Sequence, residues 1–352
     1  MRLTYLRRKS TAATVLSAVG LVLAAASGCE RIYDGEGDCS LTYRIPVKQT
    51  LNIVGADAFS TRVPSVTVYL FDESGRLAAS KSASGAALSS GNYAMEFTEM
   101  EVAPGTYDII VWGGLADNGA FALDGGSAPA TKEDLVCRLV REREGEGAVS
   151  RKQLGSLFHG MQNGVVFPEG SGVKTVTAGI DLTKNTNTVR VILQHYNGRA
   201  MDMNDFHFTV IDDNGAMNYD NALLSDEIVK YGEWTKKEAD VSRPESRAGE
   251  VASISSVVAE IDVARLVKGS GVNASLIVDV EGKDEPILNL PLIDLLVLAK
   301  GEAHRAGMTD QEYLDWQDDF TLFFYLDNAY GWYANAGIWI NSWHVVLQDK
   351  DL

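Results

Sequence analysis

The stretch that decides the fold class is SVTVYLFDESGRL, residues 65–77. Its first seven residues mix β-branched and aromatic side chains with partial alternation, which is typical of a β-strand. The strand runs into Asp72-Glu73-Ser74-Gly75. This is a turn sequence, because Gly accepts a positive φ and Asp can bond to the local backbone. We therefore predict a β-hairpin here.

The same pattern returns in the second half of the chain, where FHFTVI (206–211) runs into Asp212-Asp213-Asn214-Gly215. Further strands are expected at 106–112, 188–194, 276–280, 321–326 and 338–347. Short strands separated by turns favour β-sandwiches. The sequence therefore predicts a mainly β protein, and two domains of similar plan are its simplest interpretation.

Helices are expected to be few and short. Thr309 and Glu312 form a capping box that opens a helix through about Trp316. The run 292–300 is either a helix or a buried strand, because the spacing of its apolar residues does not distinguish the two. A strand is predicted at 135–140. Polar loops are predicted at 82–91, 142–150 and 236–250.

The amino end has the features of a secretion signal. A basic head (residues 2–9) is followed by apolar or small residues up to Ala26. The apolar part is about 16 residues long, short of the roughly 20 that a membrane span needs. Ala26-Ser27-Gly28-Cys29 fits the bacterial lipobox, although Ala26 stands where Leu is usual. We predict a lipoprotein signal peptide at residues 1–28 and lipid attachment at Cys29; the alternative is an ordinary cleaved signal with an incidental cysteine.

The mature chain divides into a tether and two domains. Residues 29–40 contain acids spaced by glycines and are expected to form an acidic tether. We predict an N-terminal β-sandwich at 41–178 and a C-terminal β-sandwich at 179–352. The boundary follows the loop sequence Pro168-Glu169-Gly170-Ser171-Gly172 and one further strand.

The chain is strongly acidic. Its formal net charge is −17. Removal of residues 1–28 takes away basic side chains and no acid, so the mature chain is more negative still. This charge argues against nucleic acid and anionic membrane surfaces as partners.

Two cysteines remain besides Cys29. Cys39 and Cys137 form a disulfide in an oxidising compartment in one interpretation, and stay as two unpaired thiols in the other.

Motifs that carry chemistry are absent from the sequence. The five histidines show no H-E-x-x-H or other ligand spacing, and there is no G-x-S-x-G elbow, Walker loop or dinucleotide fingerprint. We therefore expect no catalytic residue, no cofactor and no metal ion. The aromatic runs at 330–333 and 339–343 fit either core aromatics of sandwich strands or a sugar-binding platform.

A series of short motifs also runs through most of the mature chain in a fixed order. They are CERIY (29–33), DC (38–39), VYLFD (68–72), PGTY (104–107), VWGG (111–114), LFHG (157–160), LTKNTN (182–187), PLID (291–294), DQEYL (310–314) and INSWHVV (340–346). Each motif alone is common. Their shared order resembles the FimB-like fimbrial anchor family of Bacteroidetes type V pili.

This resemblance implies two transthyretin-like β-sandwich domains in tandem with a few short helices, and no enzymatic activity. It also implies a lipoprotein in the cell outer membrane, surface-exposed and held by lipid through acylated Cys29. Such a protein attaches the base of a fimbria and helps its assembly or length control. The resemblance implies no cofactor.

The expected partner is a fimbrial stalk subunit that binds by strand addition, because an open sheet edge accepts a strand through backbone hydrogen bonds. The strand 338–347 is the candidate edge, although an internal core strand is the plainer interpretation. Two alternative functions remain. One is a polymerising stalk or tip subunit of the same superfamily, which would lose Cys29. The other is a surface glycan-binding lipoprotein with a row of exposed aromatics.

Overall fold

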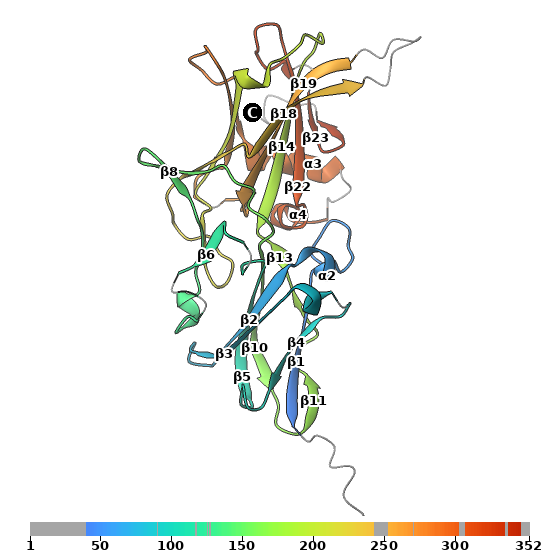
Figure 1. Ribbon diagram of the computed structural model, residues 1–352. Helices are drawn as coiled ribbons and strands as arrows, with labels where there is room; N and C mark the ends of the chain where they lie inside the picture. The colour runs from blue at the N-terminus through green and yellow to red at the C-terminus, as the bar shows by residue number, and fades with distance from the viewer. Residues whose placement is uncertain are drawn as a thin grey trace, which may run out of the picture.

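The computed structural model describes residues 40–89, 91–116, 118–124, 126, 128–242, 253–269, 271–302, 307–334 and 337–345. The protein is elongated, with the N-terminal strands at one end and the C-terminal strands at the other (Figure 1). Strands dominate and the helices are few and short, so the predicted mainly β class is confirmed. The predicted signal peptide, Cys29 and Cys39 lie outside the described residues.

Two facing sheets form the first sandwich. The four-stranded sheet contains β1 (Leu41–Lys48), β4 (Ala94–Thr98), β11 (Gly172–Thr175) and β12 (Ile180–Asp181). The five-stranded sheet runs β13 (Thr183–Lys184), β10 (Phe158–Phe167), β5 (Gly105–Gly113), β2 (Ser65–Phe71) and β3 (Leu77–Ser84). β1 alternates buried and half-buried side chains, as expected for a strand with one face on a core. The predicted hairpin at 65–77 is confirmed as the antiparallel pair β2–β3.

Two six-stranded sheets form the second sandwich. The first runs β18 (Thr235–Ser242), β19 (Ser253–Ala264), β14 (Thr186–His195), β22 (Asp319–Leu326), β23 (Ile338–Ile340) and β24 (Trp343–Val345). The second runs β21 (Leu288–Pro291), β20 (Ser275–Val280), β15 (Phe206–Asp212), β17 (Val229–Gly232), β9 (Gly147–Ser150) and β8 (Glu142–Glu144). The larger hydrophobic core lies between them.

A three-stranded sheet joins the two halves of the chain: β16 (Ala216–Met217), β7 (Cys137–Leu139) and β6 (Phe121–Leu123). Phe121, Leu139 and Leu157 belong to the larger core although they precede β14 in the chain. The strands β8 and β9 likewise extend the second sandwich through the pairing of β9 with β17. The boundary near Gly179 stays a prediction, and the larger core takes side chains from both sides of it.

The helices are α2 (Phe59–Arg62), α3 (Leu292–Glu302) and α4 (Asp310–Trp316), with 3₁₀ turns η1 (Gly85–Leu88), η2 (Lys132–Asp134) and η3 (Met203–Asp205). The predicted capping box of Thr309 and Glu312 opens α4. The undecided run at 292–300 is helical and packs Leu292 and Leu296 into the larger core. In the described part of the chain, no helix combines the length and apolar character that crossing a bilayer requires.

Three loop predictions need correction. Residues 142–150 form the β8–β9 hairpin, because β9 finds its partner β17 far away in the sequence. The predicted loop 82–91 begins too early, since β3 continues to Ser84. The predicted loop 236–250 is also wrong over the part that belongs to β18, and its residues 243–250 lie outside the described ranges.

Two strand predictions also need correction. β15 does not form a hairpin with β16, the strand that follows Gly215 directly. It pairs instead with β17 and β20, while β16 pairs with β7. Over its described residues, 338–345, the expected strand 338–347 is two strands, β23 and β24, joined at Asn341 and Ser342. Asn341 has φ 55° there, which a continuous strand would not allow.

Candidate functional site

The chain enters the first sandwich at its outer tip. Leu41 at the start of β1 pairs with Gly172 of β11, while Val47 near its end pairs with Ile180. Ile180 leads through β13 into the second sandwich, so the Leu41 end of β1 is the remote one (Figure 1). The residues before Ser40, including the predicted lipid site Cys29, therefore attach to this tip.

Cys137 lies in β7, fully buried in the larger core, and forms no disulfide with another residue of the described ranges. Burial raises the pKa of this thiol far above its usual range, so it stays protonated and unreactive. Cys39 lies outside the described residues, and its pairing with Cys137 stays a prediction.

Six aromatic rings lie on the outer face of the sheet that contains β14, β22, β23 and β24. We call them the aromatic belt: Tyr196, Phe323, Tyr325, Tyr333, Trp339 and His344. The pairing register explains part of it, because residues opposite one another in a sheet share a face. Phe323 lies opposite Trp339, and Trp339 lies opposite His344.

Neighbouring rings of the belt touch in pairs. Tyr196 stacks on Tyr333 with ring centroids 5.1 Å apart. Phe323 meets Tyr325 edge to face at 4.8 Å, and Trp339 meets His344 at 4.9 Å. Three of these side chains are well exposed: Tyr196 at 48%, Trp339 at 40% and Tyr333 at 38%.

The two interpretations of the aromatic runs at 330–333 and 339–343 each hold for part of them. Tyr330 and Trp332 pack against the larger core. Tyr333 and Trp339 point to the opposite, outer face. Exposed aromatic side chains gathered on one face of a sheet are a feature of interaction surfaces.

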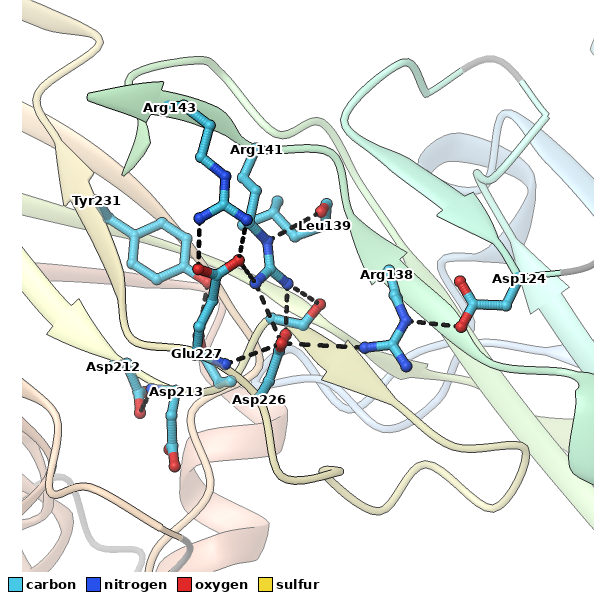
Figure 2. Close-up of polar contacts among 12 residues, drawn as sticks. Asp124, Arg138, Leu139, Arg141, Arg143, Asp212, Asp213, Asp226, Glu227 and Tyr231 are labelled. Carbon is cyan, nitrogen blue, oxygen red and sulfur yellow. Dashed lines mark hydrogen bonds and ion pairs between the residues drawn. The ribbon is translucent and has the colours of Figure 1, made fainter. Parts of the chain in front are cut away.

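A network of ion pairs fixes the β7–β8 segment to the second sandwich (Figure 2). Arg141 pairs with Asp226 and, at 3.0 Å, with Glu227. Arg143 contacts the other oxygen of Glu227 at 2.6 Å, while Arg138 pairs with Asp124 at 2.6 Å. Burial raises the pKa of Asp226, but the hydrogen bonds from Arg141 and from the Glu227 N–H, together with the charges of Arg141 and Arg138, outweigh it and hold that pKa below its usual value. The network is structural, because its groups satisfy one another.

A second polar group lies close to this network, at the end of β15. Asp212 is 2% exposed and accepts a hydrogen bond from the backbone N–H of Asp213 at 2.8 Å. Burial raises the pKa of Asp212 to about 7. The buried Tyr231 hydroxyl donates to Asn214 Oδ1 at 2.6 Å. Within the described ranges, no group of three or more His, Cys, Asp or Glu side chains is placed to hold a metal ion.

The sequence marked Asp212 as a turn residue and gave no sign of its burial. The burial comes from the pairing of Asp212 with Val229, which lies beyond the reach of a local pattern. The sequence predicted only part of the aromatic belt, because side chains of the run 330–333 alternate between the two faces of the sheet. Tyr196 belongs to the belt through its stacking on Tyr333, and no local signal in the sequence connects these two residues.

Comparison with known proteins identifies the family. A family model, the fimbrillin-A associated anchor proteins Mfa1 and Mfa2, matches residues 36–349. The chain belongs to this family. The resemblance to fimbrial anchors is therefore confirmed, and the chain is a fimbria-associated protein of the cell envelope. A search of functionally curated proteins finds no match.

Solved structures share the fold over their whole length. A candidate adhesin from Bacteroides thetaiotaomicron is 27% identical, with a TM-score of 0.74 over 88% of this chain and 99% of that one. A candidate polysaccharide-binding protein from the same organism is 26% identical, with a TM-score of 0.71 over 89% and 100%. The fimbrial anchor protein Mfa2 from Porphyromonas gingivalis, 17% identical, shares the fold with a TM-score of 0.63 over 87% and 99%.

Proposed function

We propose that this protein is a lipid-anchored structural protein that attaches the base of a fimbria to the outer membrane and helps its assembly or length control. The observation that carries the proposal is the anchor-family match, which begins at residue 36, just after the lipobox cysteine. The proposed partner is a fimbrial stalk subunit that binds by strand addition. The role is structural and not enzymatic.

The tip position of β1 supports this arrangement. Acyl chains on Cys29 would hold the tip of the first sandwich near the membrane, each buried CH₂ contributing about 0.8 kcal/mol. The second sandwich would then point away from the membrane (Figure 1). A fimbria held by this protein would begin beyond the lipid surface, where it does not collide with the bilayer.

The test replaces the lipid site in the full chain. We expect Cys29→Ala to leave the outer-membrane fraction and to release fimbriae into the medium, because a single thiol is the proposed attachment point. Cys39→Ala serves as the control and is expected to stay in the membrane fraction. Retention of Cys29→Ala in the outer membrane would contradict the proposal.

Saccharide binding is a second candidate function, favoured by the aromatic belt. Aromatic rings with one exposed face offer apolar area for the C–H face of a sugar ring, and the Tyr hydroxyls offer hydrogen bonds. The 26% identical relative described as a candidate polysaccharide-binding protein adds support.

Binding to a panel of purified bacterial and host polysaccharides tests this candidate. We expect Trp339→Ala and Tyr333→Ala to weaken binding at least about tenfold, which corresponds to about 1.4 kcal/mol. Met100→Ala removes an apolar side chain that is 91% exposed, on the first sandwich and away from the belt, and is the control. Equal affinities for all three variants would exclude the belt as a sugar site.

A further inference from the structure

Every open β-sheet has edge strands, and proteins normally protect them from unwanted pairing by short length, charge, proline or a bulge. Most edge strands of the five- and six-stranded sheets follow this rule. β13 has two residues, β24 has three, and β21 has four, ending in Pro291. β8 consists of Glu142, Arg143 and Glu144. β18 is long but carries Lys236, Lys237 and Glu238.

β3 departs from the rule over most of its length, because its pairing with β2 is irregular only at the start, where Leu77 lies opposite Phe71 and Ala79 opposite Leu70. It has eight residues, LAASKSAS, with no proline and no acid, in a chain that holds 48 acidic residues. Among the described edge strands of these sheets, β3 alone is both longer than four residues and nearly free of charge. At its start, the Leu77 N–H donates to Ala130 O; beyond that, β3 pairs only with β2 among the described strands.

The one charge on β3 does not guard the edge. Lys81 Nζ lies 2.8 Å from Glu101 Oε1 and donates to the backbone oxygen of Glu96 in β4 at 2.9 Å. The ammonium also lies over the ring of Phe97 at 5.6 Å. The side chain is therefore directed across the sandwich to the facing sheet, and the backbone groups of β3 stay accessible.

The inner face of β3 carries two small residues, one on each side of Lys81. Ala79 and Ala83 lie opposite Leu70 and Val66, and they pack half-buried against the smaller core. The outer face carries Ser80 and Ser82, both exposed. Two small residues at the rim of a core present little side-chain bulk to an added strand, whose apolar side chains could pack beside them.

We propose that the regular part of the β3 edge, from Ala79 to Ser84, is the acceptor for an extended strand of a fimbrial subunit. Only an extended polypeptide matches a row of backbone N–H and C=O groups along an edge. The added strand would place apolar residues at alternate positions toward Ala79 and Ala83, and polar residues toward Ser80 and Ser82. The absence of acidic side chains on β3 removes the repulsion that an acidic protein would otherwise present. This inference rests on the proposed function and names the contact for the strand addition.

The experiment uses the full lipoprotein in its native host. A photo-crosslinking amino acid replaces Ser80, and a second variant carries it at Asp279, an exposed position of β20 in the second sandwich. After irradiation of whole cells, the products are identified by mass spectrometry. In parallel, Ala83→Lys directs an ammonium into the space for the added strand, while Ser80→Lys places the same charge on the solvent face. Thermal unfolding checks that both lysine variants fold.

We expect the fimbrial subunit to crosslink from position 80 and not from position 279. We also expect Ala83→Lys to reduce the co-purified subunit at least about tenfold and Ser80→Lys to change it less than about twofold. Co-purification that is undiminished by Ala83→Lys, with no crosslink at 80, would overturn the β3 acceptor and leave the anchor function intact. Absence of any fimbrial subunit from the parent protein would instead reject the proposed function, and this inference with it.

Discussion

At the residue scale, Asp212 shows how burial makes a carboxyl group respond to pH. Its pKa is about 7 in the folded protein and about 3.9 in an unfolded chain. Between these values the folded state binds a proton that the unfolded state has released. The free energy of unfolding therefore falls as pH rises from about 4 to about 7, and this loss is complete above that range.

We predict that Asp212→Asn removes this loss, because Asn keeps the shape without the charge. At pH 8 the variant should be more stable than the parent by about 2 to 4 kcal/mol. Urea unfolding at pH 5 and pH 8 measures it. Asp279→Asn, at an exposed position, should keep the slope of the parent. Parallel pH profiles for Asp212→Asn and the parent would show that Asp212 is ionised in the fold.

Arg141 tests the ion-pair network at the same scale. Its side chain is 11% exposed and that of its partner Asp226 is 12% exposed. Its loss leaves this buried carboxylate with only Arg138, 3.9 Å away, and the N–H of Glu227 as partners. We predict that Arg141→Met lowers the free energy of unfolding by about 3 kcal/mol. Arg143→Met, at a side chain 57% exposed, should cost less than about 1 kcal/mol. Chemical denaturation of the two variants compares them, and equal losses would contradict this account of the network.

At the element scale, Gly114 follows the last residue of β5 and makes a close backbone contact with the segment before β10. Its φ is +75°, its N–H donates to Ser65 O at 2.7 Å, and an added Cβ would lie 2.0 Å from Ser156 O. The end of β5 therefore touches the connection that leads into β10. This contact is possible only without a side chain at this position.

We predict that Gly114→Ala costs about 3 kcal/mol or more, because a backbone oxygen must move as well as φ. Gly164 has a similar φ of +64° with nothing within 4 Å of its added Cβ. Gly164→Ala should therefore cost only the strain of about 1 kcal/mol. Differential scanning calorimetry separates the two. If the two variants lose the same stability, the close approach at Gly114 is not a constraint.

The elements that the sequence predicted are those with local signals. The β2–β3 hairpin carries its own strand and turn residues, and α4 carries its own capping box. The β8–β9 hairpin was interpreted as a loop, because its charged residues carry no alternation and its stability comes from β17. The sequence likewise could not predict that β3 lies at the edge of its sheet, because the position of a strand in a sheet depends on all the other strands.

At the scale of the whole molecule, the segment between β5 and β10 ties the two sandwiches together. It supplies β9 to the second sandwich and Phe121 and Leu139 to the larger core. Composition and motif order were enough to predict the class and the family. They could not predict that the segment between β5 and β10 contributes to the second sandwich, because this contribution depends on pairings between residues far apart in the chain.

We predict that residues 179–352 do not fold alone. Without the preceding residues, β17 would lose its partner strand β9, and the larger core would lose Phe121 and Leu139. Circular dichroism during heating should show no cooperative transition for this fragment. Co-expression with residues 41–178 should restore the transition. A fragment that unfolds alone at the temperature of the intact chain would show that the exchanged segment is dispensable.

In the proposed function, the mature chain stays attached to lipid through Cys29 while it holds a fimbria. The most direct measurement is an antibody pull-down of the untagged protein from detergent-solubilised outer membranes, with mass spectrometry of its amino end and of its partners. We expect an acylated Cys29 at the amino end and a co-purifying fimbrial subunit. A mature chain that begins well past Cys29 would contradict the account and indicate a polymerising subunit of the fimbria instead.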